Sequence, residues 1–200
     1  MRRLSLIALS VAALLAGIAQ AQAARSLGTD PGGVLLPDES GPAAIEPRSS
    51  PAVSPVPREI VAFAGNHAPG TIVVSTAERR LYLVLSGGKA MRYGIGVGRP
   101  GFTWGGTQTI TRKAQWPDWR PPAEMLKRRP DLPRHMKGGP ANPLGARAMY
   151  LGSSIYRIHG SNEPETIGQA VSSGCIRMTN EDVADLYERV KVGTTVVVLR

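Results

Sequence analysis

One cysteine and one histidine are the residues of this chain best suited to covalent chemistry. Cys175 is the single cysteine among the 200 residues and lies in the segment 172–178, SSGCIRM, whereas His159 lies in the segment 156–160, YRIHG. A free thiol is only a few per cent ionised at neutral pH, and a histidine within hydrogen-bond reach can take its proton or form an ion pair with the thiolate. The two residues therefore predict a nucleophilic cysteine with a histidine as its proton donor and acceptor.

A buried structural thiol is the alternative for Cys175, because free cysteine is among the residue types most often found inside proteins. The residues around it favour the nucleophile. Ser172, Ser173 and Gly174 predict a small polar turn that exposes backbone N–H groups, and Arg177 follows two residues after the cysteine. A guanidinium near a thiol favours the thiolate. We therefore interpret Cys175 as the nucleophile of an enzyme.

The residue counts exclude several kinds of site. A single cysteine rules out an intramolecular disulfide, a four-cysteine zinc site and an iron–sulfur cluster held by cysteines. His67 and His135 lie in polar segments without ligand partners at a useful spacing. We therefore expect neither a metal site nor a cofactor.

The chain is basic, with a formal net charge of +9 from 24 basic and 15 acidic residues. A domain this basic could bind nucleic acid, but the sequence has no RNP, helix-turn-helix or zinc-finger pattern. We expect no nucleic-acid partner. For an exported protein, a positive charge favours cell-wall polymers, anionic lipid headgroups and peptides that carry carboxylates.

The first 58 residues predict export followed by a linker. Residues 1–23 combine two arginines, a run of 15 uncharged residues and small residues suited to cleavage, which is typical of a cleaved secretory signal peptide. The apolar run is short for a membrane span, so we expect no stable membrane span after processing. Residues 24–58 contain seven prolines and little aliphatic periodicity, which predicts a disordered proline-rich linker. Residues 59–200 remain as the catalytic domain.

Short segments rich in valine and isoleucine predict a mainly β domain. The expected strands cover residues 59–64, 71–75, 80–85, 89–97, 146–151, 155–158 and 194–199. One clear helix is expected over 180–190, where four apolar residues recur at helical spacing. Residues 99–145 hold three tryptophans and eight prolines without a sustained period, which predicts a long irregular loop that acts as a lid over a site.

These motifs resemble those of a known enzyme family. His-Gly at 159–160, Ser-x-Gly-Cys-Ile-Arg-Met at 172–178 and the following Asn-x-Asp-Val are similar to the L,D-transpeptidase catalytic domain, the YkuD-like fold. The segments WPDWRPP at 116–122 and GPANPLGA at 139–146 match as well, and the resemblance runs from about residue 70 to 199. It implies a β-sandwich or barrel with one or two short helices and a long lid loop.

The resemblance also implies roles for the residues around the cysteine. The backbone carbonyl of Gly160 would orient His159, and the backbone N–H groups of Gly174 and Cys175 would form the oxyanion hole. Many family members have a second histidine where this chain has Ser173. His159 is therefore the one base expected near the thiol.

The resemblance further implies a set of substrate-binding residues, namely Arg177, Ser172, Ser173, Asn142 and Arg147. Two interpretations of Arg177 stay open. Its guanidinium could bind carboxylate or amide oxygens of the substrate, or it could form a structural ion pair with an acid of the following helix, such as Asp182.

The family implies a substrate and a two-step reaction. Cys175 would attack the amide bond between the diamino acid at position three and D-Ala at position four of a peptidoglycan tetrapeptide stem, releasing D-Ala and leaving a thioester. The acceptor would be an amine of a second stem, of an envelope protein lysine or of a free D-amino acid. Two alternatives stay open: an L,D-carboxypeptidase that uses water at the same site, and a non-catalytic wall-binding module. The signal peptide and the resemblance together imply the periplasm.

Overall fold

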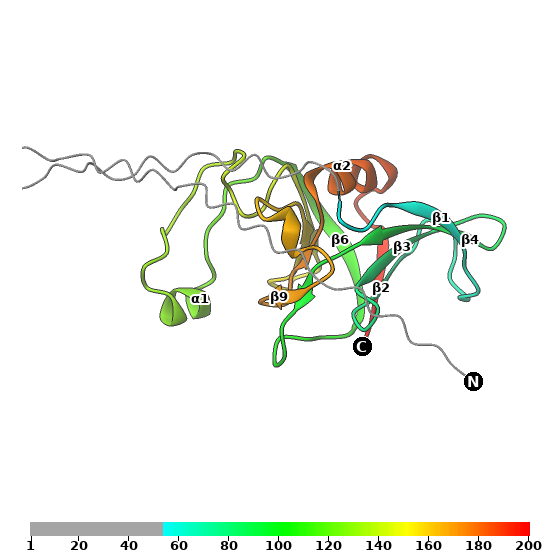
Figure 1. Cartoon of the computed structure of the whole chain (residues 1–200), viewed down its shortest axis with the longest axis horizontal. Coiled ribbons are helices and arrows are strands. Elements are labelled where there is room, and N and C mark those ends of the chain that lie inside the picture. Colours follow the sequence, from blue (N-terminus) through cyan, green and yellow to red (C-terminus); the bar gives the residue numbers. More distant parts are fainter. Residues whose placement is uncertain (1–53) are drawn as a thin grey trace, which may run out of the picture. The chain divides into compact units, whose positions relative to one another are not determined.

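The structure is a computed structural model that describes residues 54–200. The signal peptide expected at 1–23 and nearly all of the linker expected at 24–58 lie outside the described residues. Within residues 54–200, no helix is both long and apolar enough to cross a membrane. Its regular secondary structure consists mainly of strands, which form two sheets (Figure 1).

A nine-stranded sheet forms most of the described chain. Its strands, in spatial order, are β1 (Glu59–Ala62), β4 (Lys89–Gly94), β3 (Arg80–Leu85), β2 (Ile72–Ser75), β11 (Thr195–Leu199), β6 (Gly106–Gln115), β7 (Arg147–Leu151), β8 (Arg157–His159) and β10 (Ile176–Arg177). The second sheet pairs β5 (Val97–Gly98) with β9 (Ala170–Ser172). Three strand pairs are parallel, namely β2–β11, β8–β10 and β5–β9, and the other neighbours are antiparallel.

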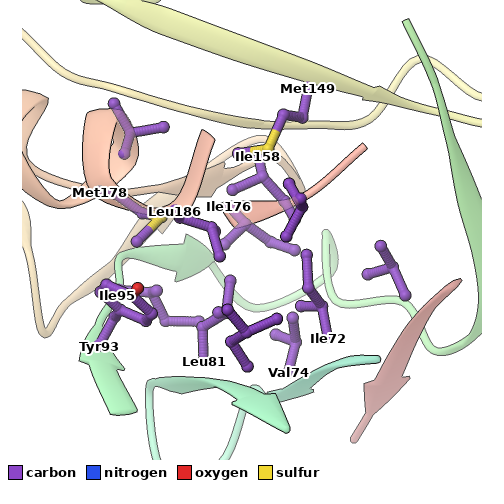
Figure 2. Close-up of a cluster of buried hydrophobic side chains, with 14 of the residues drawn as sticks. Ile72, Val74, Leu81, Tyr93, Ile95, Met149, Ile158, Ile176, Met178 and Leu186 are labelled. Atoms are coloured by element: carbon purple, nitrogen blue, oxygen red, sulfur yellow. The ribbon is translucent and has the colours of Figure 1, made fainter. Parts of the chain in front are cut away.

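The long strand β6 links the two halves of the large sheet. Its first residues pair with β11 and its last residues pair with β7, and the register shifts between Ile110 and Arg112. Such an irregularity bends a strand. Side chains from both halves consequently meet in one hydrophobic core, where Figure 2 shows Ile72 of β2 in the same cluster as Ile158 of β8.

Two predicted elements have their expected places. The hairpin expected from residues 80–97 is formed by β3 and β4, and Gly87 and Gly88 between them have φ values of +71° and +66°, which glycine adopts without strain. The helix expected over 180–190 is α2 (Asn180–Arg189), whose Val183 and Leu186 are buried in the core.

The expectation of one irregular loop over residues 99–145 is wrong in its middle. Ten of these residues form β6, and a further six form the helix α1 (Ala123–Arg128). In β6 only Ile110 is buried, so no alternation of apolar and polar residues marks the strand. Its threonines favour β structure, but hydrophobic periodicity is the stronger signal, and it is missing.

The mainly β architecture itself is confirmed. In the described residues, α1 and α2 are the two α-helices, and Pro164–Thr166 forms a single 3₁₀ turn. α2 packs against β7 and β8 and thereby supports the strands that carry the candidate site from behind. The fold therefore makes the position of β8 dependent on the stability of α2.

Thr179 allows the contribution of the α2 cap to stability to be tested. Its hydroxyl accepts a hydrogen bond from the N–H of Asp182 at 3.1 Å and caps the first turn of α2. Thr179→Ala should lower the free energy of unfolding in urea by about 1 kcal/mol, because the cap is lost. Thr179→Ser lacks the same methyl group but keeps the hydroxyl, and it serves as the control. An alanine variant as stable as the serine variant would contradict the role of the cap.

Candidate active site

The strands β8 and β10 place the candidate catalytic side chains on one face. They are parallel neighbours, with Ile176 opposite Ile158 and Arg177 opposite His159. Because successive side chains of a strand point to opposite faces, the two isoleucines point into the core, where both are buried. Cys175 directly precedes β10 and falls on the face of Arg177. The thiol and the imidazole are therefore diagonal neighbours across one pair of strands.

A cleft of about 520 Å³ opens on this face. The predicted site residues that line it are Cys175, His159, Arg177, Ser172 and Ser173. The segment 99–145, where the sequence predicted a lid and which we call the lid segment, contributes Phe102, Trp119, Met125, Arg128 and Leu132 to the lining. The lining as a whole contains four arginines and two glutamates, so the cleft favours an anionic ligand.

His159 is held in one orientation by the chain that follows it. Its Nδ1 lies 2.6 Å from the carbonyl oxygen of Gly160. A carbonyl oxygen can only accept, so Nδ1 carries the proton and Nε2 is left as the base. The Oδ1 of Asn180 accepts from the N–H of Ala146 at 2.8 Å, and a side chain at position 160 would collide with it. Asn180 thus packs closely against the glycine that orients the imidazole.

Burial keeps the imidazole neutral. His159 is 5% exposed, and burial together with the charges of Arg177 and Arg157 lowers its pKa to about 3, against the opposing effect of two backbone carbonyls. At neutral pH this histidine is therefore a neutral acceptor. It cannot hold a stable ion pair with a thiolate, so it takes the proton only as the sulfur attacks.

Cys175 is half-buried, and its thiol is likewise neutral at rest. Burial raises the pKa of the Cys175 thiol, and the guanidinium groups of Arg157 and Arg177 act against this rise. Its Sγ lies 3.9 Å from the carbonyl oxygen of Ile155, which suits a weak S–H donor. The resting site therefore pairs a thiol with a neutral imidazole.

The turn before the cysteine is closed by Ser172. Its hydroxyl donates to the carbonyl oxygen of Cys175 at 2.6 Å and accepts from the N–H of Gly174 at 3.1 Å. The Gly174 N–H, which the resemblance assigns to the oxyanion hole, therefore serves the turn in this structure. The N–H of Cys175 has no backbone acceptor among residues 54–200 and is the donor left for an oxyanion.

Position 174 requires glycine. Its φ is +106°, and a Cβ would lie 2.5 Å from the ring of Tyr156. That ring stacks on Trp104 with centroids 4.5 Å apart, and the indole N–H of Trp104 donates to the carbonyl oxygen of Gly174 at 2.7 Å. The two aromatic rings therefore hold the turn that carries the cysteine.

Arg177 forms an ion pair, but its partner differs from the one expected. Its guanidinium lies 2.9 Å from the carboxylate of Glu163, whereas Asp182 pairs with Arg58 at 3.2 Å. Of the two interpretations of Arg177, the ion pair with an acid of the following helix is not found, because Arg177 faces the cleft, whose wall includes Glu163, while Asp182 is buried in the first turn of α2. The guanidinium of Arg177 still lines the cleft.

Asn142 and Arg147 do not line the cleft, in contrast to what the resemblance implies. Asn142 is buried, and its amide donates to three loop carbonyls at 3.1–3.2 Å and accepts from the N–H of Leu144 at 2.9 Å. Arg147 lies on β7, with its guanidinium 5.4 Å from the ring of Tyr187 in α2. The first residue therefore organises the lid, and the second packs against α2.

Two residues of the cleft escaped the sequence analysis. Arg157 lies on β8 two residues before His159 and shares its face, so the alternation Arg-Ile-His was a signal that could have found it. Glu163 follows β8 in a loop and carried no such signal. Both lie in the wall of the cleft.

Aromatic and basic side chains of the lid segment pack against one another, and Arg99 also donates to the hydroxyl of Ser173 at 3.4 Å. The guanidinium carbons of Arg99 and Arg128 lie 4.2 Å and 5.0 Å from the ring centroid of Phe102. Trp119 is buried in the wall, whereas Trp116 is exposed.

Among residues 54–200, no group of three or more histidine, cysteine or acidic side chains could hold a metal ion.

Comparison with known sequences identifies relatives of this site. The sequence profile of the YkuD family, described as the L,D-transpeptidase catalytic domain, matches residues 69–198. The probable L,D-transpeptidase ErfK/SrfK of Escherichia coli K12 is 39% identical over 137 residues, which cover 64% of this chain and 43% of that protein. The probable L,D-transpeptidase YbiS of the same organism is 40% identical over 134 residues, covering 62% and 43%. The match spans less than half the length of either relative.

Solved structures share the fold at lower identity. An L,D-transpeptidase from Mycobacterium smegmatis superposes with a TM-score of 0.54 at 20% identity and covers 66% of this chain and 59% of its own. L,D-transpeptidase 3 from Mycobacterium tuberculosis gives a TM-score of 0.54 at 18% identity, covering 65% and 60%. At such identities the likeness concerns the fold alone.

The buried imidazole makes stability depend on pH. An unfolded histidine takes up a proton below its ordinary pKa of about 6.5, whereas folded His159 stays neutral down to about pH 3. Between these two pH values the unfolded state binds more protons than the folded state. Lowering the pH therefore reduces the free energy of unfolding, by at most about 1.4 kcal/mol per pH unit. Urea unfolding between about pH 6 and pH 4 should show a smaller loss for His159→Gln than for the wild type.

The matched control is His67→Gln, which removes a histidine outside the cleft and should keep the wild-type loss. Equal losses of stability in the wild type and in His159→Gln would contradict a buried imidazole that stays neutral.

Proposed function

The chain belongs to the L,D-transpeptidase family with the YkuD catalytic domain, and we propose that it is a peptidoglycan L,D-transpeptidase with Cys175 as its nucleophile. The donor is a tetrapeptide stem, and the bond attacked joins the diamino acid at position three to D-Ala at position four. D-Ala leaves, a thioester forms, and an amine takes the acyl group. One observation carries the proposal: the thiol and a neutral, oriented imidazole share one face of the β8–β10 pair.

In the first step, Sγ of Cys175 attacks the amide carbonyl carbon while Nε2 of His159 takes the thiol proton. The imidazolium formed in this way is disfavoured by its burial and by Arg177 and Arg157. It therefore returns the proton to the amine of D-Ala as the C–N bond breaks. Donation from the N–H of Cys175 stabilises the oxyanion, and the N–H of Gly174 joins it only when the Ser172 hydroxyl releases it.

In the second step, an acceptor amine attacks the thioester and loses its proton to Nε2 of His159. The C–S bond breaks, and the thiolate of Cys175 recovers a proton. Water in place of the amine would make the protein an L,D-carboxypeptidase, which is the alternative function of the same site. A non-catalytic wall-binding module is not favoured, since a module that only binds has no need of an oriented base beside a thiol.

The charge of the cleft suits a donor that carries carboxylates. Arg177 is 22% exposed at its side chain, and Glu163 holds it in one orientation at the wall of the cleft. We assign Arg177 to donor binding on that ground, because a fixed guanidinium binds carboxylate and amide oxygens well. Ser173 is assigned with it because it also lines the cleft. Ser172 acts on the substrate indirectly, through the turn that carries Cys175.

The place of action belongs to the same proposal. The leader pattern of residues 1–23 and the proline-rich segment 24–58 support a protein that is exported to the periplasm and cleaved. The donor stems and their acceptors, a second stem or an envelope protein, are then in the same compartment as the catalytic domain.

Product analysis tests the proposal. Purified disaccharide-tetrapeptide is incubated with the protein and with Cys175→Ala, and the products are identified by mass spectrometry. We expect loss of D-Ala together with a dimer or an amine-exchanged product in the wild type, and neither in the variant. Loss of D-Ala to water alone, even with amine added, would favour the carboxypeptidase. A folded protein with a free thiol and no reaction would refute both enzymes.

The low pKa of His159 predicts an unusual pH profile. A free histidine base would lose kcat/KM below about pH 6.5, whereas this imidazole stays unprotonated to about pH 3. The kcat/KM for release of D-Ala should therefore stay level between about pH 7 and pH 5. The measurement is a stopped assay of D-Ala over that range, and an acid limb with an apparent pKa near 6.5 would contradict the mechanism.

A further inference from the structure

A second cavity, of about 360 Å³, adjoins the cleft and has a basic lining. Its charged residues are Arg112, Arg120, Arg157 and Asp118, and the ring of Tyr150 lies among them. Arg157 lines both this cavity and the cleft that contains the thiol. The two spaces therefore share part of their walls, at Arg157 and Leu144.

The strand register explains why they meet there. Arg112 of β6 is opposite Tyr150 of β7, and Tyr150 is opposite Arg157 of β8. On the next strand the pairing of Ile176 with Ile158 puts Cys175, one residue earlier, beside Arg157. One row across four strands thus leads from the second cavity to the nucleophile. Adjacent strands are about 4.8 Å apart, so each step in the row is short.

Tyr150 prepares two guanidinium groups for a ligand. The guanidinium carbon of Arg112 lies 3.6 Å from its ring centroid, and that of Arg157 lies 5.3 Å away. Stacking on an aromatic ring fixes the plane of a guanidinium while its N–H groups stay available at the edge. Less conformational entropy is then lost when an anion binds.

The positive charge of the cavity is only partly neutralised from within. None of Arg112, Arg120 and Arg157 forms an ion pair inside the described part of the chain, and the buried Nε of Arg157 has no hydrogen-bond partner there. The one carboxylate of the lining is already engaged, because Asp118 contacts His135 at 2.9 Å and accepts from a backbone N–H at 3.0 Å. With three guanidinium groups against one carboxylate, the lining keeps a positive charge that suits an anionic ligand.

We propose that this cavity binds a carboxylate of the acceptor, so that the acceptor is an amine that shares its carbon with a carboxylate. The inference rests on the proposed function and narrows it. In such an α-amino carboxylate the nitrogen is two bonds from the carboxyl carbon. A carboxylate held at Arg157 then places the amine beside the thioester on the neighbouring strand. A lysine ε-amine of a protein has no carboxylate at that distance.

The transfer step balances without any further reactant. The acceptor nitrogen attacks the thioester carbon, a C–N bond forms and the C–S bond breaks. The nitrogen gives up a proton to Nε2 of His159, and that proton returns to the sulfur. The carboxylate at Arg112 and Arg157 is unchanged, because it only orients the amine.

A pair of acceptors that differ in the carboxylate alone tests the site. The acceptors are glycine and glycinamide, each at the same concentration of unprotonated amine, with the same tetrapeptide donor. The readout is the ratio of transfer to hydrolysis, which does not depend on how much enzyme is active or how fast it is acylated. Arg112→Gln should lower this ratio about tenfold for glycine, the loss of one charge-assisted contact, and leave it unchanged for glycinamide.

The matched control is Arg134→Gln, which removes the same charge from an exposed lid residue outside both cavities and should keep both ratios. Arg112→Lys keeps the charge without the planar fork and should give an intermediate ratio for glycine. An equal fall for both acceptors, or no fall for glycine, would overturn the carboxylate site while leaving the transpeptidase in place.

Binding without turnover separates the two proposals. If the wild type released no D-Ala, the proposed function would fail. Carboxylate binding in the second cavity would then be tested separately, in the Cys175→Ala variant. N-acetylglycine is titrated into this variant, and the arginine Nε–H signals are followed by NMR. A saturable shift of an arginine signal that disappears in the double variant Cys175→Ala, Arg112→Gln supports the carboxylate site. The lack of any saturable shift in Cys175→Ala refutes it.

Discussion

The register between β8 and β10 is the constraint on which the site depends. A slip of one residue would turn Cys175 and Arg177 toward the core and Ile176 toward the cleft. Exposing the isoleucine would cost roughly 2 kcal/mol, and burying an unpaired guanidinium would cost more. The hydrophobic pattern therefore selects the register that exposes the thiol. On its other edge β10 is held by Gly96, which exchanges two hydrogen bonds of 2.9 Å each with Arg177.

The same placement sets the proton chemistry. Arg157 and Arg177 face both reacting groups, so they lower the pKa of His159 and oppose the rise in the pKa of Cys175. Their charge favours a thiolate but disfavours an imidazolium. A proton moved from sulfur to nitrogen is therefore held only briefly, and it is passed to the amine of D-Ala as that group leaves. The site therefore suits a reaction in which His159 passes the proton on within the same step and does not remain protonated.

Local sequence signals were enough to predict the fold class and the reacting residues, but not strand β6 or the contacts of several site residues. The residues around Cys175 and His159 and the short segments rich in valine and isoleucine predicted a mainly β enzyme, because each of these features lies within a few consecutive residues. β6 was missed, since a strand with one buried side chain shows no period. Asn142 and the partner of Arg177 were misplaced because their contacts join segments that only the folded chain brings together. Arg157 was readable in principle, two residues before His159 on the same strand.

Trapping the thioester tests the central claim most directly. The protein is mixed with purified disaccharide-tetrapeptide, quenched in acid before deacylation is complete, and analysed by intact-protein mass spectrometry with peptide mapping. The account predicts an adduct with the mass of the donor less that of D-Ala, attached to Cys175. An adduct on another residue, or release of D-Ala by a protein whose Cys175 is blocked, would contradict it.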